Sequence, residues 1–284
     1  MVDQRCVPCF LKTYKRLFQK FDVSETQQKA FLEYFYTTIE TDGSGFAPII
    51  QRNLNKTFCR IINIDDPFRE EKEESNRVAL ELYDEWKPKV IASENAFNMA
   101  LKLAIAGNIM DYGASNSFDI HKTIDRVFAS DFAIDNSEML RQGLQKARKV
   151  LYLGDNAGEI VFDRLLIETI MHGNIGFAVK GAPILNDVTV DDSVQVGMHY
   201  AADVISNGYD APSTILDRCS REFQEEFRSA DLIMSKGQGN LEGLLGENDS
   251  RIFFLLMVKC DLIAEMLGVT KGDFVVYNKQ YQTN

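Results

Sequence analysis

Polar residues with the chemistry of a small-molecule site follow four short apolar runs in the second half of the chain. The polar segments are GDNAGE (154–159), KGAPILND (180–187), NG (207–208) and KGQGN (236–240). One such segment is weak evidence, because Asp and Asn are also ordinary turn-forming and helix-capping residues. Four of them after four successive runs favour a shared binding site.

Asp155, Asn156 and Asp187 supply two carboxylates and one amide oxygen after two neighbouring runs. Oxygen ligands favour hard divalent cations such as Mg²⁺ or Mn²⁺ over zinc. The structural alternative makes Asp155 a helix cap and Asn156 a turn residue. The position of Asp187 on the neighbouring loop favours a metal site.

The segment KGQGN (236–240) has the composition of a phosphate-binding turn. Gly237 and Gly239 expose backbone amides where a helix would begin, and Lys236 adds a cation. The segment is not a Walker loop, because the GK[ST] ending is missing. With Gly243 it also forms a GxGxxxG spacing that approaches the dinucleotide fingerprint, but that fingerprint belongs after the first strand of a sheet. Phosphate binding is therefore favoured over nicotinamide binding.

Asn108 and Asp111 interrupt an otherwise apolar helical segment of the first half. Their spacing of three places both on one face of the expected helix. Polar groups on such a face need partners. They either cap a neighbouring helix or line a cleft between the two halves, and the sequence favours neither alternative.

The charge balance excludes several classes of protein. Lys and Arg number 31 and Asp and Glu 42, which gives a net charge of −11. Such a chain repels nucleic-acid phosphates and anionic lipids, and it carries no run of basic residues. The longest strongly apolar run, 252–258, is too short to cross a membrane, and the first residues do not form a signal peptide. We therefore expect a cytoplasmic protein with neither a nucleic-acid nor a membrane partner; no pattern specifies an oligomeric state.

The five cysteines are an odd number, which indicates reduced thiols in the absence of a secretion signal. Cys6 and Cys9 form a single CVPC motif. Neither a second CxxC nor an HxxxH supplies the other two ligands of a structural zinc site. The pair is therefore interpreted as two half-buried thiols on a first helix.

The spacing of apolar residues predicts the helices and strands that must position these residues, and it differs between the two halves of the chain. Apolar residues recur with helical spacing up to residue 146, and the run EEKEE (70–74) is interpreted as a solvated helix face. After Lys149, short β-branched runs alternate with helical segments, which is typical of a parallel sheet covered on both faces. The sequence predicts an α/β protein, with a helical domain (1–146) followed by a doubly wound α/β domain (147–284). Ligands bind at the carboxyl ends of strands in such sheets, where all four polar segments fall.

The motifs GDNAGE, KGxPxLND, SNG and DLIMSKGQGN, with an upstream AGNxxD and an N-terminal CxPC, resemble those of the damage-control phosphatases (domain of unknown function family 89) in their prokaryotic branch. The resemblance runs over nearly the whole chain, with the motifs in the same order. It implies a helical domain on a Rossmann-like three-layer α/β/α domain with a largely parallel sheet. It also implies hydrolysis of phosphate monoesters with a divalent cation (Mg, Mn, Co or Ni), the favoured substrates being sugar phosphates and related damaged phosphometabolites.

The resemblance also implies roles for particular residues. The family's metal-binding Asp-Asn pair falls on Asp155 and Asn156, its second metal aspartate on Asp187 and its phosphate-binding lysine on Lys236. It leaves Cys6 and Cys9 without a role. Further site residues that the resemblance implies are Glu159, as a catalytic residue, and Asn108 and Asp111, as substrate-binding residues. The KGQGN turn itself adds Gly237, Gly239 and Asn240 as substrate-binding residues, because its amides can face a phosphate.

The sequence thus supports the hypothesis of a metal-dependent phosphatase acting on a small phosphorylated metabolite. A metal would orient or activate water, and Lys236 with the turn amides would offset charge on the phosphoryl oxygens. Asp155 or Glu159 would act as base or nucleophile. An aspartyl-phosphate intermediate is less favoured, because haloacid-dehalogenase-type phosphatases carry DxD after the first strand and residue 157 here is Ala. The alternatives are a nucleotide-dependent oxidoreductase or kinase, and a non-catalytic metal- or metabolite-binding protein.

Overall fold

A computed structural model describes residues 3–41, 45–107 and 120–281, so Asn108 and Asp111 lie outside the described residues. The helices are α1 (Val7–Lys20), α2 (Glu25–Thr41), α3 (Ala47–Ile62), α4 (Arg69–Ala92), α5 (Ala96–Ala106), α6 (Ile120–Ala129), α7 (Ser137–Lys146), α8 (Glu159–Ile170), α9 (Val190–Gln195), α10 (Arg221–Ser229), α11 (Gly237–Leu244) and α12 (Asp261–Leu267). The strands are β1 (Ile134–Asp135), β2 (Val150–Leu153), β3 (Ile175–Val179), β4 (Asp203–Ser206), β5 (Leu232–Lys236), β6 (Ile252–Met257) and β7 (Phe274–Tyr277). Within those ranges, no helix combines the length and the apolar character that a bilayer crossing requires.

The strands form one sheet in the order β1-β7-β6-β5-β2-β3-β4. Neighbouring strands are parallel except β6 and β7, which are antiparallel. Leu151 of β2 pairs with Gly176 of β3 on one side and with Ile233 of β5 on the other. The chain leaves β2 toward β3 and β4 and then crosses to β5, so the order reverses between β2 and β5. A ligand site is expected beyond the carboxyl ends of these two strands.

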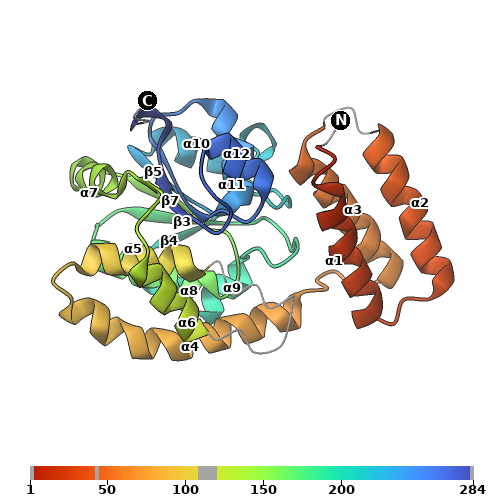
Figure 1. The fold of residues 1–284 in the computed structure, drawn as a ribbon, viewed down its shortest axis with the longest axis horizontal. Helices are drawn as coiled ribbons and strands as arrows, with labels where there is room; N and C mark the ends of the chain where they lie inside the picture. The colour runs from red at the N-terminus through yellow and green to blue at the C-terminus, as the bar shows by residue number, and fades with distance from the viewer. Residues whose placement is uncertain (1–2, 42–44, 108–119, 282–284) are drawn as a thin grey trace.

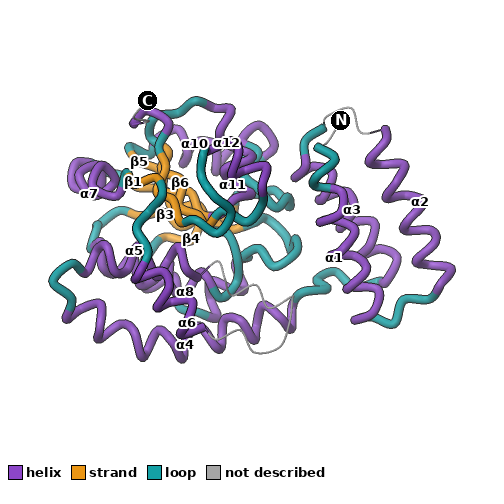
Figure 2. The backbone as a smooth tube through the Cα atoms, in the orientation of Figure 1, coloured by secondary structure: helices purple, strands orange, loops and turns teal. Residues whose placement is uncertain are grey.

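Helices cover both faces of the sheet, as Figures 1 and 2 show. Alternate residues of each strand point to opposite faces. Val150 and Tyr152 of β2 pack in a core with α5, α6, α7 and α8, and α4 packs on the outside of α5 and α8. Leu151 and Leu153 pack in a second core with α10, α11 and α12. The α/β fold with a largely parallel sheet is therefore confirmed.

Helices α1, α2 and α3 form a separate bundle beside α11 and α12 (Figure 1). The bundle core is rich in aromatic side chains, with Tyr14 and Phe31 ring centroids 4.6 Å apart and Phe58 packed against both. Leu185, from the loop after β3, packs into this core. Its φ of +47° is unusual for a residue with a side chain. The bundle and the loop that carries Asp187 are therefore joined through an apolar contact.

The hydrophobic cores divide the described chain differently from the expected domains, 1–146 and 147–284. Leu82 and Trp86 of α4, Leu101 of α5 and Leu140 of α7 belong to the same core as β2. The bundle α1–α3 has its own core, so the division falls after α3. The periodicity of a helix shows that one face is buried, but it does not show whether a helix or a sheet covers that face.

Candidate active site

A short backbone pairing brings Asp155, Asn156 and Asp187 together at the carboxyl edge of the sheet. Asn156 and Asp187 form an isolated antiparallel β-bridge. The backbone N–H of Val188 donates to the Asp155 carbonyl at 2.9 Å. The loops after β2 and β3 are therefore held side by side by main-chain hydrogen bonds, independently of any ligand.

The carboxylates at this edge lie in an environment that disfavours their charge. Asp187 is 3% exposed, its Oδ2 accepts no hydrogen bond from the described residues, and Lys180 Nζ lies 3.4 Å away as an ion-pair partner. Burial raises the pKa of Asp187 to about 6, although the Lys180 ammonium opposes the rise. Burial, together with the nearby Glu159 and Asp187 carboxylates, raises the pKa of Asp155 well above its usual range. A cation bound between the two loops would relieve this accumulation of negative charge.

The donor set fits a hard divalent cation. It consists of oxygen atoms, and the buried Asp187 Oδ2 without a hydrogen-bond donor is the kind of atom that a metal satisfies. Asn156 Nδ2 donates to Asp155 Oδ2 at 2.7 Å and to Glu159 Oε2 at 3.2 Å, which orients the amide. Among the residues that the structure describes, no cluster of three or more His, Cys, Asp or Glu is arranged for a metal. The candidate site therefore depends on the Asn156 amide oxygen as its third protein ligand.

Lys236 lies beneath this edge and not in front of it. The residue is fully buried, and its Nζ donates to the Ala104 carbonyl at 2.7 Å, Glu159 Oε1 at 2.5 Å and Asp163 Oδ1 at 2.6 Å. These three bonds use all the protons of the ammonium group. The placement differs from the expected one, in which the ammonium faced the glycine turn. Strand alternation explains it, because Lys236 shares its face of β5 with Met234, which packs in the core beneath α8.

Glu159, the first residue of α8, connects Lys236 to the metal-ligand candidates. One carboxylate oxygen accepts from Lys236 and the other from Asn156. Tyr152 and Lys236 both donate to Asp163 Oδ1, and burial raises the pKa of Asp163 to about 7 against the effect of Lys236. Glu159 and Lys236 therefore form a buried support for the Asn156 side chain.

The glycine turn after β5 packs directly against Asp155. Gly237 has a φ of +78°, and a Cβ atom added to it would lie 1.9 Å from Asp155 Oδ2. A Cβ atom added to Gly239 would lie 2.3 Å from the Pro212 carbonyl oxygen, so this glycine permits close packing of the loop after β4. Asn240 is buried and donates to the Gly154 carbonyl at 3.1 Å, so it braces the β2 loop. Of the expected turn residues, Gly237 is the one that borders the metal-ligand candidates.

Two lysines that were not predicted as site residues flank the carboxylates. Lys180 Nζ lies 3.4 Å from both Asp187 Oδ2 and Asn240 Oδ1, and the residue is 3% exposed. The charge of Lys259, after β6, opposes the rise in the pKa of Asp155, and its backbone N–H donates to Gln238 Oε1 at 3.2 Å. Both follow a strand that ends at this edge. That position is the sequence signal by which both lysines could have been found.

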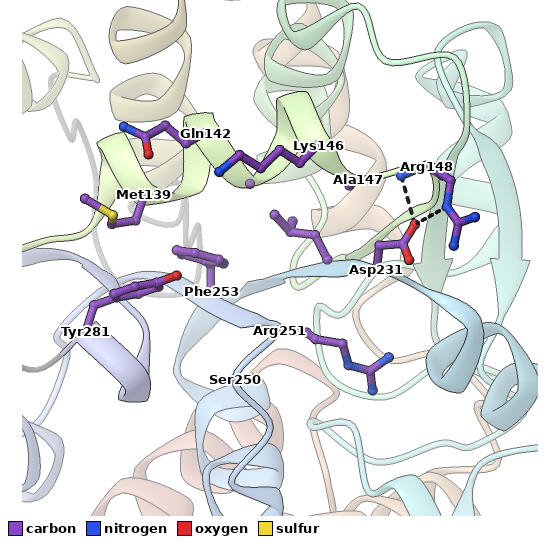
Figure 3. A pocket seen from close by; sticks show the side chains of 12 residues that line it. Met139, Gln142, Lys146, Ala147, Arg148, Asp231, Ser250, Arg251, Phe253 and Tyr281 are labelled. Carbon is purple, nitrogen blue, oxygen red and sulfur yellow. Dashed lines mark hydrogen bonds and ion pairs between the residues drawn. The ribbon is translucent and has the colours of Figure 1, made fainter.

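A cavity of about 330 Å³ lies at the opposite, amino-terminal edge of the sheet (Figure 3). Its lining includes Lys146 of α7, Asp231 before β5 and Phe253 of β6. Asp231 Oδ2 accepts from the Arg148 backbone N–H at 2.8 Å. The cavity contains none of the expected site residues and is not the candidate active site.

We expect Gly237→Ala to weaken both metal binding and activity. The new Cβ atom would push the Asp155 carboxylate aside, and an alanine at this φ costs about 1–2 kcal/mol. Titration with Mn²⁺ and phosphate-release assays measure the two effects. Gly246→Ala is the matched control, because an added Cβ atom there meets nothing within 4 Å. Equal behaviour of the two variants would mean that Gly237 does not border a working site.

The chain is similar to proteins of one known family. The model of the family described as "Damage-control phosphatase ARMT1-like domain" matches residues 2–275. The chain is 38% identical over 227 residues to a damage-control phosphatase of Pyrococcus horikoshii, with 78% of each chain covered. It is 33% identical over 234 residues to a damage-control phosphatase of Archaeoglobus fulgidus, covering 78% of this chain and 79% of the relative.

A solved structure extends the similarity to the fold. The crystal structure of a family 89 (DUF89) protein from P. horikoshii has a TM-score of 0.89, with 32% sequence identity and 98% of each chain covered. The family match and the similarity in fold thus each extend over nearly the whole chain. The protein belongs to the ARMT1-like damage-control phosphatase family.

Proposed function

We propose that this protein is a divalent-metal-dependent phosphatase that hydrolyses phosphate monoesters of small metabolites, sugar phosphates or related damaged phosphometabolites. Family membership supports phosphatase activity. The observation that carries the metal dependence is the pairing of Asp155 and Asn156 with Asp187. The buried Oδ2 of Asp187 forms no hydrogen bond with the described residues and has the Lys180 ammonium 3.4 Å away as its ion-pair partner. A phosphorylated small molecule is accordingly the proposed partner, and the cytoplasmic location stays a prediction.

Asp155, Asn156 and Asp187 would hold the cation, which is Mg²⁺, Mn²⁺, Co²⁺ or Ni²⁺ by the nature of the ligands and the family resemblance. A divalent cation supplies Lewis-acid stabilisation of phosphoryl oxygens. Lys180 and Lys259 flank the same edge and would offset the negative charge of the phosphoryl group as it transfers.

Glu159, Asp155 and Lys236 have different proposed roles at this edge of the sheet. Glu159 is fully buried, and both of its carboxylate oxygens accept hydrogen bonds, so it orients Asn156. Asp155 is only partly buried and borders the Gly237 turn. We therefore assign to the Asp155 carboxylate the role of accepting the proton of the attacking water. All three N–H groups of the Lys236 ammonium are engaged in hydrogen bonds, so Lys236 supports Glu159 and does not contact the phosphate.

A phosphate-release screen over many phosphometabolites, each with several divalent cations, tests this proposal. EDTA is expected to abolish release, and Mg²⁺, Mn²⁺, Co²⁺ or Ni²⁺ to restore it, because an oxygen-ligand site exchanges its cation reversibly. Full activity in EDTA would contradict the metal dependence. Binding of NAD or ATP without phosphate release would favour an oxidoreductase or kinase, and tight metal binding without turnover would favour a binding protein.

A further inference from the structure

A single buried side chain of α4 connects the two helices that follow the metal-ligand loops. Asn76 is fully buried, and its Oδ1 accepts the backbone N–H of Gly158 at 2.7 Å. Gly158 immediately precedes α8, which follows the Asp155–Asn156 loop. Asn76 Nδ2 donates to Asp192 Oδ1 at 3.2 Å and to Gln195 Oε1 at 2.7 Å, both on α9, which follows the Asp187 loop.

Asp192 is itself tied to the start of the same helix. Its Oδ2 accepts the backbone N–H of Thr189 at 2.8 Å and the Thr189 hydroxyl at 2.7 Å, so it fixes the chain two residues after Asp187. Lys72, one turn before Asn76 on α4 and 4% exposed, pairs with Asp192 Oδ2 at 3.1 Å and with Asp66 Oδ2 at 3.0 Å. The charge of Asp192 is therefore balanced within the network.

These contacts have a cost that apolar packing would avoid. Burying a lysine, an aspartate and an asparagine in contact contributes little net stability, and apolar residues of similar volume often pack as well or better. Farther along α4, Ala79, Leu82 and Trp86 make apolar contacts of that kind. The polar contacts of Tyr83 and Lys87 with Glu168 farther along α4 are partly exposed. The buried polar network of Lys72 and Asn76 lies where α4 contacts both loops, which indicates a requirement for fixed geometry there.

Resting on the proposed function, we propose that Asn76 and Lys72 are positioning residues that set the separation of the Asp155–Asn156 loop from the Asp187 loop. They bind Gly158 and Asp192, which adjoin the two metal-ligand loops. They act by fixing the positions of Gly158 and Asp192 relative to each other, and thereby the positions of the two loops. Removing groups that orient metal ligands typically changes the affinity for the metal by about 10–100-fold.

The first test is the affinity of the substrate-free protein for Mn²⁺, measured by electron paramagnetic resonance, together with hydrogen exchange of the Val188 amide. That amide donates to the Asp155 carbonyl, so it reports the loop pairing without contacting Asn76. Asn76→Ala is expected to weaken Mn²⁺ binding about 10–100-fold and to accelerate exchange at Val188. Tyr83→Phe is the matched control on α4. It removes a hydrogen bond of 2.6 Å to Glu168, which lies near the carboxyl end of α8, away from the metal-ligand loops. It should leave both readouts at the wild-type values.

The second test exchanges the two partners. Asn76→Asp alone places a carboxylate against Asp192 and should weaken Mn²⁺ binding. Combined with Asp192→Asn it keeps one carboxylate and one amide in contact, and should recover most of the affinity. This pair also serves if Asn76→Ala fails to fold.

Three results would overturn the inference: wild-type Mn²⁺ affinity and wild-type Val188 exchange in Asn76→Ala, equal losses in Tyr83→Phe, or no recovery in the exchanged pair. A wild-type protein that binds no Mn²⁺ would contradict the proposed function instead. The exchange rate at Val188 would then still decide whether Asn76 positions the loops.

Discussion

Lys236→Met is expected to lower the free energy of unfolding by about 3–5 kcal/mol and to abolish phosphate release. The substitution removes the cation that lies 2.5 Å from Glu159 Oε1 and 2.6 Å from Asp163 Oδ1, and leaves two buried carboxylates without it. Urea denaturation and a phosphate-release assay measure the two losses. The expected loss of stability follows from the complete burial of the ammonium, which a lysine at the mouth of a phosphate site would not have.

The matched variant neutralises the whole group, with Lys236→Met combined with Glu159→Gln and Asp163→Asn. It should recover much of the lost stability, since replacing buried charges by neutral groups of the same shape is often tolerated. It should remain inactive, because the support of Asn156 is altered. A Lys236→Met protein that is as stable as the wild type but inactive would instead support direct contact between Lys236 and the phosphate.

Asp155→Asn is expected to reduce phosphate release by about 10³-fold or more, while stability stays equal or rises. The loss corresponds to about 4 kcal/mol of transition-state stabilisation, within the range that a metal ion and its ligands supply. Stability is retained because the substitution removes one of three neighbouring carboxylates, whose mutual repulsion and burial raise the pKa of Asp155. Steady-state turnover and thermal melting without metal provide the measurements.

Asp231→Asn is the control for this prediction. Asp231 lies at the opposite edge of the sheet and accepts hydrogen bonds from the backbone of Arg148 and Lys149. Its replacement should lower stability modestly and leave turnover unchanged. If Asp155→Asn kept wild-type turnover, Asp155 would be neither a metal ligand nor the base.

The gathering of the site at one edge could be predicted from the sequence, because the rule for parallel sheets needs only the strand ends. The short β-branched runs expected after Lys149 form strands of the sheet, and the loops that carry Asp155 and Asp187 meet as the rule requires. β1 was missed because its two residues carry no periodic signal. The direction of the Lys236 side chain was not predicted, although strand alternation could have shown it. Leu232 and Met234 lie on the same face of β5 as Lys236, and that face packs in the core.

The role of α4 could not be predicted from its sequence. The run 70–74 is highly charged, and four of its five residues are glutamates, which is typical of a solvated face. The structure instead buries Lys72 in the middle of that run, where Asp66 and Asp192 balance its charge. Asp192 lies 120 residues away in sequence, and local patterns carry no information about such a partner.

The contacts between the α1–α3 bundle and the rest of the molecule have an evolutionary consequence. Leu185 packs against the bundle core, and Arg52 and Lys56 of α3 pair with Asp210 after β4. Substitutions among the aromatic residues inside the bundle can compensate one another without affecting the catalytic edge. Changes at these contacts must occur in pairs, one on each side. Across related sequences, position 185 should therefore covary with the bundle core, and position 52 with position 210.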